Sequence, residues 1–367
     1  MQEQEGQSNR GSLSMIQISL IELAIISANR HYFFEESRVS FGAYLIQQNE
    51  GKVASSFVAM QEDQLDVGDV TIAVAYSGVN YKDALAATGV GRIIRRYPCI
   101  GGIDMAGTVV KSTSPDFVPG DAVIATSYDI GVAHHGGYAE LARVPAQWVL
   151  KLPSGLDLRA AMALGTAGFT AGLAVARMEH NGLRPENGPV VVSGATGGVG
   201  SIAVEILAKA GYEVHALTGK ADATDYLNAL GAKGVILRSS LDLAKIKSLD
   251  KAIWAGAVDN LGGDVLAWMA STMKQDGTLA SIGLAASMEL KTSVAPFILR
   301  GVSLLGIDSG YCPMPLRVEV WRRLASDLKP VKVIEQAREI RFTELPNVFE
   351  DFLQARVKGR VIVSIQS

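Results

Sequence analysis

The chain has 367 residues, of which 48% are hydrophobic and 19% are charged, a length and composition typical of a globular protein with two domains. A formal net charge of −3 gives no electrostatic attraction to nucleic acid or to an anionic membrane, so neither is an expected partner. The two cysteines, Cys99 and Cys312, exclude a disulfide framework and a four-cysteine zinc lobe, and the cytoplasm is the expected compartment.

Residues 1–38 differ in composition from the rest of the chain. Residues 1–14 are polar, and the apolar stretch at 16–26 is too short to span a bilayer and lacks the features of a secretory signal. We expect a disordered or loosely helical extension here. A sharper hypothesis is that Val39 is the true initiator, read from a GUG codon, and that the upstream residues are a start-site or cloning artefact.

From residue 39 to about 160 the chain consists of short apolar runs separated by turn residues. Asn49-Glu50-Gly51 and Pro119-Gly120-Asp121 are two such turns, and no long helical pattern occurs. The strands that we expect cover 43–47, 52–60, 69–77, 101–111, 121–126 and a segment from 136 towards 144. This spacing predicts a compact, barrel-like β domain.

After Pro153 the pattern changes to alternating helices and strands. The first helix is predicted at 158–178, and strands are predicted at 190–192, 212–217, 234–237, 256–260, 277–283 and 302–307. Helices between most of these strands indicate a doubly wound parallel sheet. The tail predicts a helix at 345–356 and a last strand at 359–365, which we expect to return to the first domain.

The parallel sheet opens with a strand, a glycine turn and an amphipathic helix. Gly194, Gly197 and Gly200 follow the apolar run 190–192, and the helix at 199–210 places its apolar residues on one face. Glycines permit a tight turn, a close approach of backbone to a pyrophosphate and close packing of helix on strand. Because the amides at the helix start bind phosphate, this segment predicts a dinucleotide site, with a turn used only for packing as the alternative.

The end of the second strand of this unit predicts which dinucleotide is bound. An acidic residue there would favour NAD, but the chain has Thr218-Gly219-Lys220, a hydroxyl and a cation suited to a 2′-phosphate. We therefore expect NADPH, and a solvated loop residue is the alternative for Lys220. Arg238, after the third strand, could contact the adenosine end or lie on the surface.

Several motifs, in order along the chain, resemble one enzyme family. They are Asn80-Tyr81-Lys82-Asp83, Gly102-Ile103-Asp104-Met105-Ala106-Gly107, Gly136-Gly137-Tyr138-Ala139-Glu140, Gly165-Thr166-Ala167-Gly168-Phe169-Thr170-Ala171, Pro296-Phe297-Ile298-Leu299-Arg300 and Gly306-Ile307-Asp308-Ser309. With the glycine turn they resemble the medium-chain dehydrogenase/reductase superfamily, and within it the bacterial quinone-oxidoreductase-like group that includes NADPH-dependent acrylyl-CoA reductase. The resemblance covers residues 41–367. It implies an α/β protein with a β-rich GroES-like catalytic domain, 39–160 with 306–367, and a Rossmann cofactor domain, 161–305.

The comparison with zinc members of this superfamily predicts that no metal is bound. Those members carry Gly-His-Glu where this chain has Gly102-Ile103-Asp104, and isoleucine cannot bind zinc. His134 and His135 are adjacent in a glycine-rich loop, and adjacent histidines rarely converge on one ion. Without a Lewis acid, reduction of a polarised carbon–carbon double bond is favoured over alcohol oxidation.

The resemblance also implies roles for residues around the cofactor. Tyr81 is expected near the nicotinamide, as donor to an enolate or as proton source, and Asn80 is expected to orient the cofactor ribose. A tyrosine packed at the domain seam is the alternative for Tyr81, and Asp83 is expected at a helix start or paired with Lys82. The residues expected to contact the cofactor are Tyr81, Thr166, Thr170, Thr196, Gly197, Gly198, Val199, Thr218, Gly219, Lys220, Arg238, Leu284, Ile298 and Ser309.

Some of these assignments have structural alternatives. Leu284 and Ile298 could equally be core residues, and Thr166 and Thr170 could only cap and fill a helix.

The substrate that the resemblance implies is a small molecule, a 2-enoyl thioester, with acrylyl-CoA reduced to propanoyl-CoA. A CoA ester carries several phosphate charges, and Arg92, Arg95 and Arg96 form a basic cluster suited to bind them, unless they are only a solvated surface. A second basic cluster consists of Arg317, Arg322 and Arg323. Two other functions stay open, namely reduction of a quinone or small enone, and NADPH sensing without turnover. We expect a homodimer.

Overall fold

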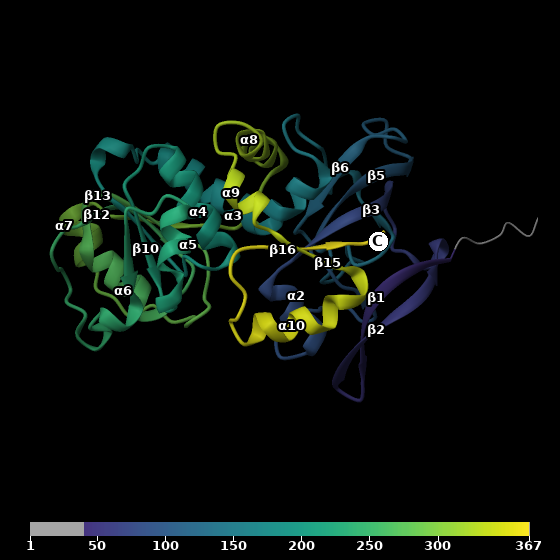
Figure 1. The fold of residues 1–367 in the computed structure, drawn as a ribbon, viewed down its shortest axis with the longest axis horizontal. Coiled ribbons are helices and arrows are strands. Elements are labelled where there is room, and N and C mark those ends of the chain that lie inside the picture. The colour runs from purple at the N-terminus through teal and green to yellow at the C-terminus, as the bar shows by residue number, and fades with distance from the viewer. Residues whose placement is uncertain (1–39, 367) are drawn as a thin grey trace, which may run out of the picture.

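The computed structural model describes residues 40–366, so the expectations for residues 1–38 and for Val39 lie outside the described residues. Figure 1 shows two lobes side by side, an α/β lobe on the left and a β-rich lobe on the right. The long helix α3 (Leu158–His180) packs on strands of both lobes. The protein is therefore an α/β protein built from a β-rich part and a parallel-sheet part, as the sequence predicts.

The β-rich lobe contains a seven-stranded and a three-stranded sheet. In spatial order the larger sheet consists of β15 (Arg338–Arg341), β16 (Val361–Ser364), β3 (Val70–Val79), β5 (Asp104–Ser112), β6 (Ala122–Thr126) and β8 (Val149–Lys151), with β7 (Leu141–Val144) paired to β3. The smaller sheet consists of β2 (Lys52–Gln61), β1 (Ser40–Asn49) and β4 (Cys99–Ile100). Alternate side chains of these strands point inward, and Ile72, Val74 and Met105 are completely buried in one shared core.

The first hairpin shows how local sequence determines register. Glu50 and Gly51 connect β1 to β2 with φ values of +49° and +80°, as a two-residue type I′ turn requires. Asn49 therefore pairs with Lys52, and the pairing continues without a shift to Ser40 and Gln61. The predicted turn is confirmed, and both strands are longer than predicted.

All strands of the six-stranded sheet in the α/β lobe are parallel. Their spatial order is β11 (Gly234–Leu237), β10 (Val214–Thr218), β9 (Val190–Ser193), β12 (Trp254–Asp259), β13 (Met273–Ser281) and β14 (Ser303–Gly306). The chain starts at β9, moves outward to β11 and then returns to the other side of β9 with β12. This reversal opens a crevice at the carboxyl ends of β9 and β12, where doubly wound sheets bind dinucleotides.

The helices cover the sheets and connect the lobes. The α-helices besides α3 are α2 (Tyr81–Thr88), α4 (Gly198–Lys209), α5 (Thr224–Ala229), α6 (Gly263–Thr272), α7 (Ala295–Arg300), α8 (Met314–Leu324), α9 (Val331–Glu335) and α10 (Leu345–Leu353). Short 3₁₀ helices occur at Glu62–Gln64, Ala146–Trp148, Pro185–Asn187, Ala221–Ala223, Arg238–Ser240, Leu243–Lys245 and Phe342–Glu344. Among the described residues, α3 alone is long and apolar enough to cross a membrane, but 83% of its apolar window is buried, as in a core helix.

The C-terminal segment joins the two lobes. After α10 the chain passes the α/β lobe, and β16 then pairs antiparallel with β3, so that Val361 lies opposite Val79. The expectation that the last strand returns to the first domain is confirmed. We retain 39–160 with 306–367 and 161–305 as the proposed domain boundaries.

Candidate active site

The glycine turn has the geometry of a phosphate-binding loop. Gly194 follows β9 with a φ of +57°, and the amide of Gly197 donates to its carbonyl oxygen at 2.9 Å. A Cβ on Gly200 would lie 2.3 Å from that same oxygen, so only glycine permits the helix to start this close to the strand. No side chain caps α4, which leaves its first amides available to an anion.

Polar side chains hold the crevice between β9 and β12 in shape. Ser193 Oγ lies 2.7 Å from Asp259 Oδ1, and the side-chain amide of Asn260 donates to the Ser193 carbonyl at 2.7 Å. Asp259 also accepts the amide of Gly262 at 2.8 Å, and its burial raises the pKa of the carboxyl group. This cluster was not predicted from the sequence, since its members come from two strands that are adjacent only in the fold.

The turn after β10 carries one cation, Lys220, and a second cation, Arg238, approaches it. Thr218 Oγ1 accepts the amide of Lys220 at 3.0 Å, and Lys220 Nζ donates to the carbonyl of Val357 at 2.8 Å. Burial, and then the charge of Lys358, lower the pKa of Lys220. The guanidinium of Arg238 lies 3.8 Å from the position that a Cβ on Gly219 would occupy. Two predicted residues, Lys220 and Arg238, are thus brought to one turn.

Two of the remaining predicted residues of the turn, Thr196 and Gly198, face the C-terminal segment. Thr196 is buried, and its carbonyl oxygen accepts the amide of Gly359 at 3.0 Å. A Cβ on Gly198 would lie 3.1 Å from Arg360 Nη1, while Gly197 is exposed and Val199 is half-buried. The segment 357–360 therefore lies along the turn that the cofactor is expected to occupy, a contact that the sequence did not indicate.

A buried polar network lies beneath the start of α2. Asn80 caps this helix reciprocally with Asp83, whose Oδ2 accepts the Asn80 amide at 2.8 Å. The Asn80 side chain also donates to Asp104 Oδ2 at 2.8 Å and accepts from Arg360 Nη1 at 3.2 Å. Asp83 is thus at a helix start, as expected, and Lys82 is not its partner. Every hydrogen-bonding atom of the Asn80 amide group is used inside the protein.

Asp104 links this network to α3. Its carboxylate accepts both the amide of Thr166, at 3.0 Å, and the Thr166 hydroxyl, at 2.5 Å. Gly165 has a φ of +51° inside α3, and a Cβ there would lie 2.5 Å from Asp104 Oδ2. The kink at this glycine therefore lets the carboxylate approach the helix backbone.

The two carboxylates and Arg360 lie together in the interior. Asp83, Asp104 and Arg360 are all buried, and burial together with the charge of Asp104 raises the pKa of Asp83 to about 7. Burial lowers the pKa of Arg360, and the charges of Asp104 and Asp83 oppose that change. Sequence analysis identified Asp104 only within a motif and missed Arg360, which is separated from Asn80 by most of the chain.

A line of hydroxyl groups runs from this network towards the α/β lobe. Thr170 Oγ1 lies 2.6 Å from the carbonyl of Thr166 and 2.8 Å from Ser309 Oγ. Ser127 Oγ lies 3.0 Å from Thr166 Oγ1. The structure therefore joins the predicted residues Thr166, Thr170 and Ser309 at the seam between the lobes.

A pocket of about 450 Å³ lies at this seam, beside the carboxyl ends of β13 and β14. Buried or half-buried apolar side chains line much of it, among them Ile103, Ile282 and Ile307, and Ile103 stands where the zinc members carry histidine. Ser309, Lys82, Arg92 and Arg95 also line it. Tyr81 precedes Lys82 in the first turn of α2; it is 50% exposed and its hydroxyl makes no hydrogen bond to residues 40–366.

The structure separates the three arginines of the predicted substrate cluster. Arg92 and Arg95 line the pocket, and Arg95 forms an ion pair with Asp129. Arg96 points elsewhere: it pairs with Asp66 and donates to the carbonyl of Ala133 at 2.8 Å.

The second basic cluster has structural contacts. Arg317 is buried between the rings of Tyr128 and Phe169, at 4.6 and 4.4 Å. Arg322 pairs with Glu319, and Arg323 pairs with Glu179 and Asp327.

Leu284 and Ile298 are not core residues. Leu284 follows β13 and Ile298 lies on α7, and both side chains are largely exposed. Neither lines the pocket at the seam. Their predicted contact with the cofactor stays a prediction.

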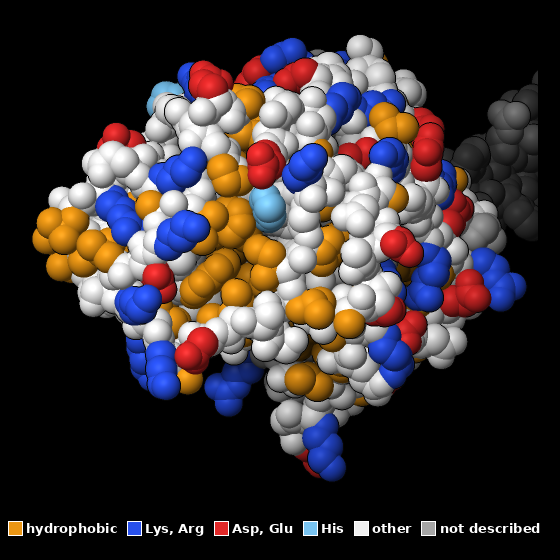
Figure 2. Space-filling view, turned by 60° about the vertical axis from the view of Figure 1, so that its left-hand side comes forward, with side chains coloured by type: hydrophobic (Ala, Val, Ile, Leu, Met, Phe, Trp, Pro, Cys, Tyr) orange, Lys and Arg blue, Asp and Glu red, His pale blue; other side chains and the backbone are white. Residues whose placement is uncertain are grey.

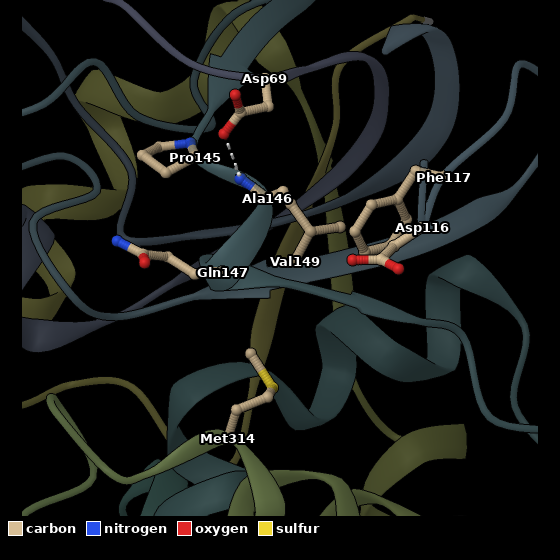
Figure 3. Close-up of a pocket in the computed structure, with 8 residues that line it drawn as sticks. All are labelled: Asp69, Asp116, Phe117, Pro145, Ala146, Gln147, Val149 and Met314. Carbon is tan, nitrogen blue, oxygen red and sulfur yellow. Dashed lines mark hydrogen bonds between the residues drawn. The ribbon is translucent and has the colours of Figure 1, made fainter. Parts of the chain in front are cut away.

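A second depression, of about 530 Å³, lies on the β-rich lobe (Figure 3). Its polar side chains include Asp69 and Asp116, and Asp69 Oδ2 accepts the amide of Ala146 at 3.0 Å. Phe117 and Met314 supply apolar surface. Because its lining contains no cation, it does not suit the phosphates of a dinucleotide.

The adjacent histidines have structural contacts in the described chain. His135 Nδ1 accepts the amide of Ile100 at 3.0 Å, and His134 Nε2 lies 3.2 Å from the carbonyl of Val67. Within residues 40–366 no group of three histidine, cysteine or acidic side chains is placed to hold a metal ion.

Comparison with known proteins identifies the family. Residues 66–154 match the alcohol dehydrogenase GroES-like domain, and residues 198–327 match the family described as zinc-binding dehydrogenase. A Bacillus subtilis (strain 168) protein named "Putative quinone oxidoreductase YhfP" is 50% identical over 326 residues, 89% of this chain and 99% of that protein. Its crystal structure with NAD bound covers the same shares of the two chains, with a TM-score of 0.87.

Two further relatives are nearly as similar. Acrylyl-CoA reductase AcuI of Ruegeria pomeroyi is 45% identical over 329 residues, 89% of this chain and all of that protein. The crystal structure of Escherichia coli K-12 YhdH with bound NADPH is 46% identical, covers 88% of this chain and all of that one, and has a TM-score of 0.85. The chain therefore belongs to the medium-chain dehydrogenase/reductase superfamily, in its quinone-oxidoreductase-like group.

Proposed function

We propose that the protein reduces the carbon–carbon double bond of a 2-enoyl thioester with NADPH, and that acrylyl-CoA is the substrate. The observation that carries this proposal is the pocket at the seam, with apolar walls, Ile103 in place of a metal ligand and basic side chains along its lining. An activated double bond needs a hydride, a donor to the developing enolate oxygen and a proton, and no metal ion. The 45% identity to acrylyl-CoA reductase AcuI supports the same choice.

The residues at the crevice fit a phosphorylated dinucleotide. Lys220 and Arg238 suit a 2′-phosphate, and the uncapped start of α4 suits the pyrophosphate. When bound, NADPH would supply the hydride. Crystal structures of relatives contain NADPH in one case and NAD in another. The choice of NADPH for this chain is therefore supported mainly by its own cations, Lys220 and Arg238.

Tyr81 and Asn80 take different roles in this proposal. The Tyr81 hydroxyl is free to donate to the thioester oxygen or to protonate Cα. The Asn80 side chain is occupied by Asp83, Asp104 and Arg360, so we assign it as a positioning residue that holds the first turn of α2 and hence Tyr81. Thr166, Thr170 and Ser309 are proposed to line the nicotinamide end.

Reduction of a quinone or small enone is the second candidate function. The apolar lining formed by Ile103, Ile282 and Ile307 would suit a compact neutral acceptor, and the relative at 50% identity is named as a quinone oxidoreductase. NADPH sensing without turnover is the third, and the free hydroxyl of Tyr81 argues against it.

One assay separates the three functions. NADPH oxidation is followed with acrylyl-CoA and with a panel of quinones and enones, before and after prolonged chelation. We expect acrylyl-CoA to give the highest kcat/KM, unchanged by the chelator, and Tyr81→Phe to lower kcat with little change in KM. Turnover of quinones alone supports the second function, and absence of any turnover with tight NADPH binding supports the third.

We also propose a cytoplasmic location and a homodimer. Cys99 and Cys312 are unpaired and buried in the fold, as is usual for thiols in a reducing compartment.

A further inference from the structure

Three exposed basic side chains line the pocket at the seam, and two of them have no partner in the described part of the chain. Arg95 pairs with Asp129 and donates to the Tyr311 hydroxyl at 3.0 Å. Lys82 and Arg92 make no ion pair and no side-chain hydrogen bond within residues 40–366. The charge of Arg95 is thus balanced by Asp129, whereas no side chain that the structure describes pairs with Lys82 or Arg92.

The acidic side chain that lines the same pocket does not neutralise them. Asp308 Oδ1 accepts the amides of Gly310 and Tyr311, at 2.8 and 3.3 Å, and so holds its own loop. Asp83, adjacent to Lys82 in sequence, is buried and accepts the amides of Asn80 and Ile103. The lining of the pocket therefore keeps an excess of positive charge.

Lys82 occupies an electrostatically unfavourable position. It is the second residue of α2, and the positive end of a helix dipole disfavours a cation in the first turn. Among residues 40–366 no carboxylate contacts the Lys82 ammonium, and the acidic residue of the same turn, Asp83, is buried and turned to other partners. A bound anion would compensate for this effect of the dipole.

The lining of the pocket changes from charged side chains at the exposed mouth to apolar side chains at the buried floor. Lys82, Arg92 and Arg95 are exposed, whereas Ile103 and Ile307 are buried. A ligand that fits this order carries its reacting acyl group inward and its negative charges outward.

We propose that Lys82 and Arg92 bind phosphate groups of the substrate and thereby select a coenzyme A thioester over an acceptor without phosphates. This inference rests on the proposed function and names two residues for it. Arg96 has no part in this role, because its guanidinium is held by Asp66 away from the pocket.

The test compares esters that share the acyl group and differ in phosphates. Acrylyl-CoA, acrylyl-dephospho-CoA and acrylyl-pantetheine are assayed with the wild-type protein, Lys82→Met, Arg92→Gln and the double variant. Lys111→Met and Arg356→Gln remove the same charges elsewhere on the β-rich lobe and its C-terminal segment and serve as matched controls. We expect each pocket variant to raise KM for acrylyl-CoA about fivefold, with kcat unchanged.

Acrylyl-pantetheine, which has no phosphate, should have the same KM in all proteins. If the pocket variants raise KM for acrylyl-dephospho-CoA as much as for acrylyl-CoA, the contact is with the diphosphate. If the rise for acrylyl-dephospho-CoA is smaller, the contact is with the 3′-phosphate. The inference would be overturned if the pocket variants raised KM equally for the CoA and pantetheine esters, or if the control variants raised KM for acrylyl-CoA as much as the pocket variants do.

Failure of the proposed function has a different result from failure of this inference. If the wild-type protein turns over quinones but none of the three esters, the function itself is wrong. If it reduces all three esters with one KM, the function stands and the role of Lys82 and Arg92 is wrong. The melting temperature of Lys82→Met provides a further control, because removing a cation from a helix start should not lower it.

Discussion

Lys220 is the residue whose charge is expected to decide between the two nicotinamide cofactors. Its ammonium donates to the Val357 carbonyl, and the guanidinium of Arg238, from the segment after β11, approaches the neighbouring Gly219, so a 2′-phosphate placed there would meet two cations. Lys220→Glu should weaken NADPH binding by about 1.5–3 kcal/mol and affect NADH much less. Fluorescence titration with both cofactors measures the ratio of the two affinities.

The matched control for this change is Lys233→Glu. Lys233 is exposed near the start of β11, and only its backbone takes part in the sheet, where its amide donates to the Val214 carbonyl. The Lys233→Glu variant changes the net charge by the same amount as Lys220→Glu, and it should leave the ratio of the NADPH and NADH affinities unchanged. An equal shift in both variants would mean that Lys220 acts only through the general field of the domain.

Asp83 should make the stability of the protein depend on pH in an unusual direction. Its pKa is raised from 3.8 to about 7, mainly by burial and then by the charge of Asp104. Between these values the folded state holds a proton that the unfolded state has released, so the free energy of unfolding falls as pH rises. The decrease from this group is about 4 kcal/mol at most.

Denaturant unfolding from about pH 4.5 to about pH 7.5 tests this dependence. The unfolding free energy of the wild-type protein should fall over the range, and that of Asp83→Asn, which cannot ionise, should fall less steeply. Because the variant is less stable for other reasons, the slope with pH is compared instead of the absolute value. Equal slopes would show that the Asp83 carboxyl group is ionised throughout.

At the level of the element, two glycines of the phosphate-binding turn have different roles: Gly200 is needed for the fold, and Gly197 is needed for the cofactor. A Cβ on Gly200 would lie 2.3 Å from the Gly194 carbonyl and 2.8 Å from the Ala195 Cα, and neither backbone atom can move freely. A Cβ on Gly197 would have a single close neighbour, that same carbonyl, at 3.3 Å. Gly200→Ala should therefore destabilise the protein by about 1–3 kcal/mol, a cost typical of an overpacked site.

Gly197→Ala should leave stability nearly unchanged and still weaken NADPH, because its methyl group would meet the pyrophosphate. Unfolding midpoints and NADPH titration on both variants distinguish the two effects. Loss of stability in Gly197→Ala, or tight NADPH binding by it, would contradict this assignment.

Elements with a strong local signal were predicted well. The run 190–192, the glycine turn and the helix behind it need only local pattern, and they occur where expected, with the helix at Gly198–Lys209. The short helix α2 was foreseen only as a helix start at Asp83, since eight residues with exposed Tyr81 and Lys82 show little periodicity.

The contacts around Asp104 could not be predicted from sequence. They join β5, the start of α2, the kink of α3 and Arg360 before β16, segments that meet only after the C-terminal strand has returned to the first sheet. The ion-pair partners of Arg95 and Arg96 could not be predicted for the same reason. Composition shows that Arg92, Arg95 and Arg96 are basic, but only the fold shows that Arg95 faces Asp129 and Arg96 faces Asp66.

For the whole molecule, the edge of the parallel sheet bears on the proposed homodimer. Among the described residues β14 pairs only with β13, and its other edge carries no strand. Leu304 on β14 is 39% exposed and Ile298 on the neighbouring α7 is 72% exposed. Figure 2, turned so that the α/β lobe comes forward, shows hydrophobic side chains gathered on the surface in view. Exposed strand edges with apolar neighbours invite pairing with another chain.

A second copy related by a two-fold axis could pair its own β14 with this edge and cover both apolar side chains. Leu304→Lys and Ile298→Lys should therefore shift the protein from dimer to monomer, because each buries a charge in the interface. Sedimentation velocity gives the mass of each variant. Val67→Lys is the matched control, since Val67 is 92% exposed on the other lobe and should leave the dimer intact. A wild-type protein that sediments as a monomer at all concentrations, or a control that dissociates equally, would contradict an interface at β14.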